Sequence, residues 1–224
     1  MKTLDLNKVE NLRAINEELQ GAETGSFKVT NPMGIHAIAA GLMTPVDVEV
    51  DGHTGYFCAG MNKAANVTIN GNAGQGVAQN IMSGTVRVKG NASAAAAATG
   101  HGGLVVVEGD ASSRCGISMK GVDIVVGGSV GHMSAFMAQA GNLVICGDAG
   151  PDLGDSLYEA KIFVGGKVSR LGSDCVEKEM TDEHLETLKD LLDQAGMDTD
   201  PSTFKRYGSA RQLYHFNIDH AGSY

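Results

Sequence analysis

The sequence predicts an all-β fold: a single-stranded, right-handed parallel β-helix with 19-residue coils and helical segments at its N- and C-terminal ends. The main observation is a repeat of seven apolar pentapeptides, each closed by glycine, which begin nineteen residues apart between Val48 and Ile162. Nineteen residues are too few for a strand, a crossover helix and a return strand, so each repeat must be one coil of a solenoid. Glycine is abundant and proline scarce, with 31 and 4 residues, which places the glycines at regular turns.

Stacked coils place equivalent residues in columns along the axis, about 4.8 Å apart. The first and third residues of every pentapeptide are apolar, which predicts two inward columns, because side chains alternate along a strand. The residue two places after each glycine is mostly small and predicts a further buried line. The residue directly after the glycine is polar; its Asx members are expected to bond nearby backbone amides, and stacked Asn side chains can also form a ladder. This corner column contains His53, Asn72, Asn91, Asp110, Ser129, Asp148 and Lys167.

The middle residue of each pentapeptide is predicted to point outward, since an inward column flanks it on each side. In the first three coils it is polar: Glu49, Thr68 and Arg87. In the last four it is apolar, and these residues form a predicted interface: Val106, Val125, Val144 and Phe163. Proteins normally cover a contiguous apolar patch of this kind. The cover is either one of the chain's own terminal segments or a partner subunit.

The chain divides into three predicted parts: an N-terminal helical segment at 1–24, the β-helix domain at 25–178, and a C-terminal helix with an extended tail at 179–224. Apolar residues at roughly helical spacing precede Gly21: Leu4, Leu6, Val9, Leu12, Ile15 and Leu19. A clearer helix is predicted from Thr181, a capping residue, to Gly196. Its apolar stripe is Leu185, Leu188, Leu191 and Leu192. Open solenoid ends need covering, so both helices are expected there, and the apolar tail residues beyond 197 pack on the solenoid or reach a partner.

Charge and apolar patterning argue against several functions. The net charge of −9 and the pI of about 5.2 disfavour nucleic acid as a partner, because binding to phosphate backbones requires a cationic face. The first twenty residues carry charges throughout, and no run of eighteen apolar residues occurs. We therefore expect a cytoplasmic protein that neither spans nor binds a membrane, and whose 4 cysteines are structural thiols.

The predicted separations within two candidate pairs of functional residues argue against a shared site. Cys58 and Cys115 share a column three coils apart, so about 14 Å separates them, too far for a disulfide or a shared metal ion. Asp110 and Asp148 are two coils apart, at about 10 Å, within or just beyond the range of an inverting glycosidase pair. The missing export signal and the lack of surface aromatics for sugar stacking argue against that hydrolytic function.

Two histidines in glycine-rich turns are further candidates for site residues. His101 and His132 fall in different columns, and a lone turn histidine is more often a surface residue than a ligand, although a role for either stays open. The G-H-G-G segment at 100–103 is not followed by a helix, and no phosphate-binding loop motif occurs. The sequence thus predicts no catalytic, cofactor-binding or metal-binding residue in this chain.

Motifs beyond the bare pentapeptide connect the chain to a known family. Within the repeat they are I-N-G-N-A-G-Q at 69–75, V-E-G-D-A at 107–111 and C-G-D-A-G at 146–150. In the flanks they are A-I-N-E-E-L at 14–19, V-T-N-P-M-G-I-H-A-I-A-A-G-L at 29–42 and Y-G-S-A-R-Q-L at 207–213. Nearly the whole chain thus resembles the glycine-rich β-helix domain that ends the large subunit of glutamate synthases. As a free-standing chain with G-D-S-L-Y-E-A-K-I-F-V-G-G at 154–166, it is most similar to the small β-helix subunit of N-methylglutamate synthase.

This resemblance implies a scaffold subunit without catalytic residues, in a complex that converts methylamine and glutamate to N-methylglutamate and ammonia. The implied partners are a glutamine amidotransferase-like subunit and an FMN-binding synthase subunit. FMN, with an iron–sulfur cluster as a further option, belongs to those partners. Two alternatives remain open: a split glutamate synthase that transfers ammonia to 2-oxoglutarate, and the β-helical subunit of formylmethanofuran dehydrogenase, which shares the repeat. The sequence decides neither the amine nor the stoichiometry.

Overall fold

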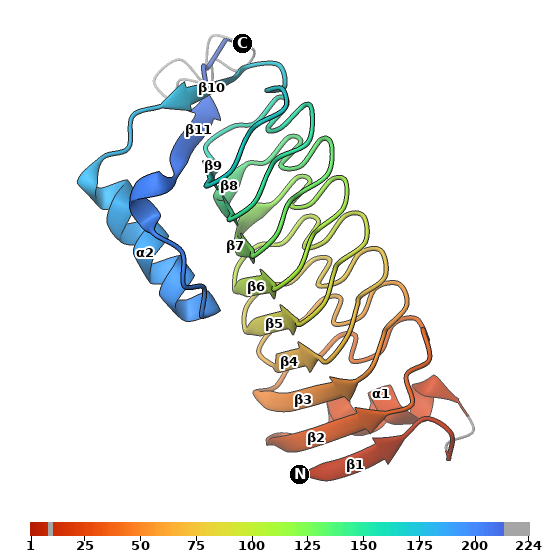
Figure 1. Cartoon of the computed structure of the whole chain (residues 1–224). Coiled ribbons are helices and arrows are strands. Elements are labelled where there is room, and N and C mark those ends of the chain that lie inside the picture. Colours follow the sequence, from red (N-terminus) through yellow and green to blue (C-terminus); the bar gives the residue numbers. More distant parts are fainter. Residues whose placement is uncertain (9–10, 213–224) are drawn as a thin grey trace, which may run out of the picture.

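The computed structural model describes residues 1–8 and 11–212 and shows one sheet wound into a parallel solenoid of about seven turns (Figure 1). The strands are β1 (Lys2–Asp5), β2 (Gly25–Thr30), β3 (Val46–Asp51), β4 (Asn66–Ile69), β5 (Thr85–Val88), β6 (Leu104–Val107), β7 (Lys120–Val126), β8 (Ala140–Ile145), β9 (Lys161–Val164), β10 (Cys175–Lys178) and β11 (Lys205–Ser209). The helices are α1 (Leu12–Gly21), α2 (Asp182–Ala195) and the short 3-10 helix η1 (Pro201–Thr203). The predicted fold class is confirmed.

The strand register follows the repeat. From β3 to β9 each strand pairs in parallel with the next at a shift of nineteen residues, as in Val48 opposite Val67, and the one irregularity among these pairs is at the start of β7, where Lys120 is opposite Ala140. A second line of parallel bridges keeps the same shift two residues after the glycines, from Thr54 to Val168. The first and third residues of all seven pentapeptides are buried. The two predicted inward columns are therefore confirmed.

The corner column forms a ladder between coils. The Oδ1 of Asn72 accepts a hydrogen bond of 2.9 Å from the backbone N–H of Asn91, and the same contact recurs in each coil from His53 to Lys167. The closing glycines leave room for it, since a Cβ on Gly90 would lie 2.3 Å from that Oδ1. The corner side chains thus bond backbone amides, as expected, and because each amide belongs to the next coil the contacts continue as a ladder along the axis.

The backbone after the corner has a conformation that the repeat did not predict. After each strand from β3 to β8, three residues two positions apart are left-handed; after β3 they are Phe57, Ala59 and Met61, with φ of 59°, 53° and 56°. This alternation points successive amides along the axis in opposite directions. The N–H of Ala59 donates to Ile38 in the preceding coil, and that of Met61 donates to Gln79 in the next. A small residue at the middle left-handed position was the available signal: Ala59, Ala78, Ala97, Gly116, Ala135 and Gly154.

The N-terminal segment corrects one prediction. Its first residues form β1, parallel to β2, and the helix begins only at Leu12. Leu4 and Leu6 are buried at a spacing of two, which suits a strand, whereas helical spacing holds only for the later positions. Val9 lies outside the described residues. Helix α1 covers the N-terminal end of the solenoid, where Asn16 accepts from the N–H of Ala39 and donates to a neighbouring carbonyl.

The C-terminal segment corrects another. Helix α2 has the predicted length and ends at Gly196, which is left-handed with φ of 68°. It does not cap the open end of the solenoid as expected, but lies along the outward sheet face (Figure 1). The chain then returns as β11, antiparallel between β9 and β10, so the sheet extends beyond 25–178 at both ends. The tail residues after 212 lie outside the described part. Neither α1 nor α2 is long and apolar enough to cross a bilayer.

Candidate functional site

The predicted outward apolar column is fully covered by the chain itself. Val106, Val125, Val144 and Phe163 are each 0% exposed. They form a separate core with side chains of α2 and of the segment after it: Leu188, Leu191, Leu192, Ala195 and Phe204. Of the two covers that the sequence left open, the structure shows the chain's own C-terminal segment. This column is not free for a partner subunit while α2 is docked.

The last polar residue of the outward column marks where the helix ends. The guanidinium of Arg87 donates through both terminal nitrogens to the carbonyl oxygen of Ala195, each at 3.0 Å, and also pairs with Glu108 at 3.0 Å. The C-terminus of a helix carries partial negative charge, so a cation there is stabilising. The change from polar to apolar residues along the column thus coincides with the end of α2.

Two buried thiols are held in the protonated form. Cys58 and Cys115 lie in one inward column, both fully buried, and neither forms a disulfide. Burial raises the pKa of each thiol to about 12, so both are protonated near neutral pH.

The remaining sequence candidates also stay apart from one another. Asp110 and Asp148 are used in the corner ladder, where each Oδ1 accepts a backbone N–H at 2.7 Å. His101 and His132 are exposed. Among the residues that the structure describes, no group of three or more His, Cys, Asp or Glu side chains could hold a metal ion.

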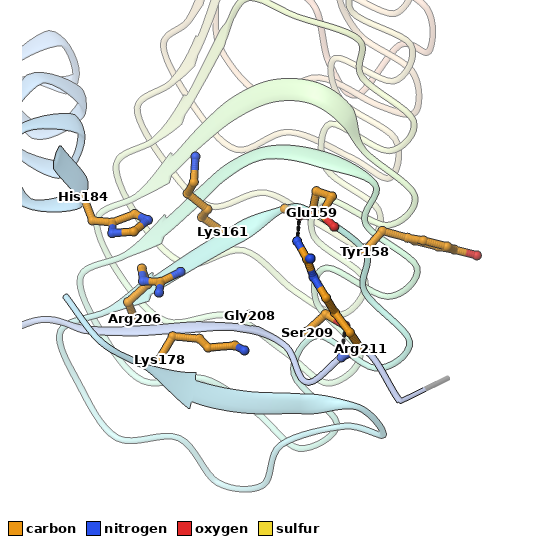
Figure 2. A pocket seen from close by; sticks show the side chains of 10 residues that line it. Tyr158, Glu159, Lys161, Lys178, His184, Arg206, Gly208, Ser209 and Arg211 are labelled. Atoms are coloured by element: carbon orange, nitrogen blue, oxygen red, sulfur yellow. Dashed lines mark hydrogen bonds and ion pairs between the residues drawn. The ribbon is translucent and has the colours of Figure 1, made fainter. Parts of the chain in front are cut away.

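A cationic pocket lies at the C-terminal end of the outward face, beside Phe163. It has a volume of about 310 Å³ and is bounded by β9, β10, β11 and the start of α2 (Figure 2). The cations lining it are Lys161, Lys178, Arg206 and Arg211, and His184 adds an imidazole. The lining includes one carboxylate, that of Glu159, which accepts from Arg211 at 2.8 Å. The pocket therefore carries a net positive charge in a chain whose net charge is −9.

Strand pairing explains why these cations face the same way. Arg206 of β11 is in register with both Lys178 of β10 and Phe163 of β9. Residues paired across strands share a face, and Lys161 stands two positions before Phe163 on the same strand. All three cations thus project from the outward face, just beyond the apolar column under α2.

His184 lines the pocket, and burial and neighbouring charges both act on its pKa. Its Nδ1 is 2.6 Å from the hydroxyl of Thr181, which stands at the predicted N-cap position but makes no hydrogen bond to the helix backbone. The pKa of His184 is lowered, mainly by burial and then by the charges of Arg206 and Lys161, while Glu183 acts in the opposite direction. The imidazole therefore stays neutral to lower pH than usual.

Sequence reasoning missed this pocket because its residues come from four separate elements. The insertion of β11 between β9 and β10 could not be read from the repeat, since β11 is antiparallel to it. One signal was available. Lys161 is a cation in a column that otherwise holds Asp47, Asn66, Thr85, Leu104, Asp123 and Asn142.

Comparison with known proteins supplies one close relative. The chain is 59% identical over 213 residues to Protein GlxC of Rhizobium meliloti (strain 1021), and the match covers 95% of this chain and 93% of that protein. No family model matches the chain. No solved structure matches it either. Identity at this level over nearly the full length of both proteins shows common descent, and the chain belongs to the GlxC family.

Proposed function

We propose that this chain is a non-catalytic scaffold subunit of a glutamate synthase-like FMN enzyme complex, which holds an amidotransferase-like subunit and an FMN-binding synthase subunit. The observation that carries the proposal is the uninterrupted 19-residue solenoid from β3 to β9, together with the glutamate synthase-like motifs within its coils. Its corner column, the most regular polar line, is used to join coils.

A solenoid of this kind suits a scaffold for mechanical reasons. Each coil contacts mainly its neighbours, so the structure is quasi-one-dimensional and sites along it keep fixed separations. The six steps from Gly52 to Gly166 span roughly 29 Å at the ordinary strand spacing. Partner subunits bound to different coils would therefore be held apart at a set distance.

The chemistry of the described residues supports a role without catalysis. The inward thiols have pKa values of about 12, and the exposed histidines His101 and His132 stand in different columns. The free cysteines fit a reducing compartment, so a cytoplasmic location is part of the proposal.

The specific reaction that we propose is the conversion of methylamine and glutamate to N-methylglutamate and ammonia. The segment at 154–166, which resembles the small subunit of N-methylglutamate synthase, supports this choice. In the structure this segment contains β9 and supplies Tyr158, Glu159 and Lys161 to the cationic pocket. The segment that most resembles that enzyme thus also contributes to the cationic pocket.

Reconstitution with partner chains tests the proposal. The chain should be purified alone and together with an FMN-binding synthase chain and an amidotransferase-like chain, and each sample assayed for flavin absorbance and amine transfer. We expect the isolated chain to be colourless and inactive, and the three-chain sample to elute as one complex that forms N-methylglutamate from methylamine. Stoichiometric flavin in the isolated chain, or full activity without it, contradicts the scaffold role. Activity only with ammonia and 2-oxoglutarate contradicts the choice of amine.

A further inference from the structure

The cationic pocket concentrates positive charge that the described residues neutralise only in part. Within residues 1–8 and 11–212, neither the Lys161 nor the Lys178 ammonium has a salt-bridge partner. Asp123 stands in the column of Lys161 but two coils away, at about 10 Å. The carboxylate inside the pocket, that of Glu159, is already bound to Arg211, and that of Glu179, whose charge acts on Arg206, lies outside the lining.

The arrangement also costs stability. Lys178 and Arg206 are directly opposite each other on antiparallel strands, and like charges in that position repel. On the other side of the same strand pair, Lys205 meets Glu177 at 3.0 Å, so the strands neutralise charge on one side and concentrate it on the other. The Nε of Arg206 donates to the carbonyl oxygen of Glu179 at 2.8 Å, which fixes the direction of its guanidinium. A fixed guanidinium with an ammonium opposite it, at the wall of a pocket, is an arrangement that favours an anionic ligand.

We propose that this pocket binds a small multivalent oxyanion, either a dicarboxylate or a phosphate, through Lys161, Lys178 and Arg206, with His184 and Arg211 at its rim. A volume of about 310 Å³ is at the small end of ligand pockets, which favours a compact anion. The guanidinium of Arg206 presents a planar donor fork that matches carboxylate or phosphate oxygens, and the two lysines supply compact charges. This inference does not depend on the scaffold role.

Anion titration of the full chain tests this binding site. Inorganic phosphate and glutarate are the probes, added at constant ionic strength with sodium chloride as the balancing salt, and binding is followed by calorimetry and by the NMR titration of His184. We expect saturable binding to one site and an upward shift of the His184 pKa, because the bound anion offsets the charges of Arg206 and Lys161. Tighter binding of phosphate identifies a phosphate site, and tighter binding of glutarate identifies a dicarboxylate site.

Matched charge variants complete the test. Lys161→Gln should weaken binding about tenfold, the loss expected for one charged hydrogen bond. Lys189→Gln removes the same charge from an exposed position of α2 and should leave affinity unchanged. Lys178→Gln is the second pocket variant if Lys161→Gln does not fold. Equal affinities for the pocket variant and the Lys189→Gln control, or an equal response to chloride alone, would overturn the proposal.

Discussion

The two halves of the outward sheet face share one backbone but have different surroundings. Strands β3 to β9 keep the same register, yet the middle residues of β3 to β5 are polar and those of β6 to β9 are apolar and covered by α2. In the uncovered half, side chains pair with one another, as Lys28 does with Asp51 at 3.2 Å. One column of residues thus decides where a helix docks on an otherwise uniform surface.

Residues of the sheet and of helix α2 together define the boundary between the two halves. Along the sheet, apolar side chains begin at Val106, and along the helix, the last carbonyl groups meet Arg87. Burial of each large apolar side chain contributes about 1.5–3 kcal/mol, whereas a cation at a helix C-terminus contributes about 0.3–1 kcal/mol, and up to about 2 kcal/mol when partly buried. The apolar column therefore supplies most of the docking energy, and Arg87 positions the helix end.

The largest expected effect comes from placing a charge in each half of the face. Val144→Asp leaves an unpaired carboxylate under α2 and should lower the free energy of unfolding by about 3–5 kcal/mol. Thr68→Asp makes the same addition in the uncovered half and should change it by no more than about 0.5 kcal/mol. Urea denaturation measures both, and similar losses in the two variants would show that the halves do not differ in the way described.

A smaller effect is expected on the helix side of the covered half. Leu188→Ala removes a fully buried side chain and should cost about 2–4 kcal/mol, with faster amide hydrogen exchange in α2 than in β3 to β5. Leu185→Ala is the control on the same helix, because Leu185 is only half-buried although it belongs to the predicted stripe. Equal losses at the two positions would mean that the helix docks through a wider face.

The boundary residue should have a smaller effect again. Arg87→Ala removes the bonds to the Ala195 carbonyl and should lower the free energy of unfolding by about 1–2 kcal/mol, mostly as fraying of the last turn of α2. Arg87→Lys keeps the charge and should recover part of this loss. Amide hydrogen exchange at residues 193–197 provides the measurement. Unchanged protection in Arg87→Ala would show that Arg87 does not stabilise the end of α2.

The smallest expected effect is a pH dependence in the covered half. Burial raises the pKa of Asp123, more than the hydrogen bonds from Asn142 and the charge of Lys161 lower it. The folded state thus holds this proton more tightly than the unfolded chain, so the stabilisation is present below the unfolded pKa of about 4 and is lost as the pH rises through the folded value. Asp123→Asn should therefore be more stable than the parent at pH 7, by a few tenths of a kcal/mol because the carboxyl is only partly buried, and equal to it at low pH.

Thermal unfolding across this pH range measures the difference. The same change at exposed Asp47, which stands in the same column of the uncovered half, is the control. A loss of stability at pH 7 in Asp123→Asn would show that the ionised carboxylate is favoured after all.

The parts of the fold that depend on neighbouring coils could be predicted from the sequence. A strict repeat of nineteen residues specifies which residues stack, so the columns of Val48 and Val50 and the corner ladder follow directly. The docking of α2 and the insertion of β11 depend on residues far apart in the chain, which no repeat relates. The apolar outward column predicted that some segment covers it, but only the structure shows that this segment is α2. The cationic pocket required the register of β11 against β9 and β10.

The corner ladder also has a direction, and this affects how the solenoid ends. Every corner side chain from His53 to Asp148 accepts a hydrogen bond from a backbone N–H of the coil that follows. Lys167, at the last step, has an ammonium, which cannot accept one. Parallel coils with exposed ends are otherwise templates for open-ended filaments. Lys167 is thus the last step of the corner ladder, and the antiparallel pairing of β11 with β9 ends the parallel stack.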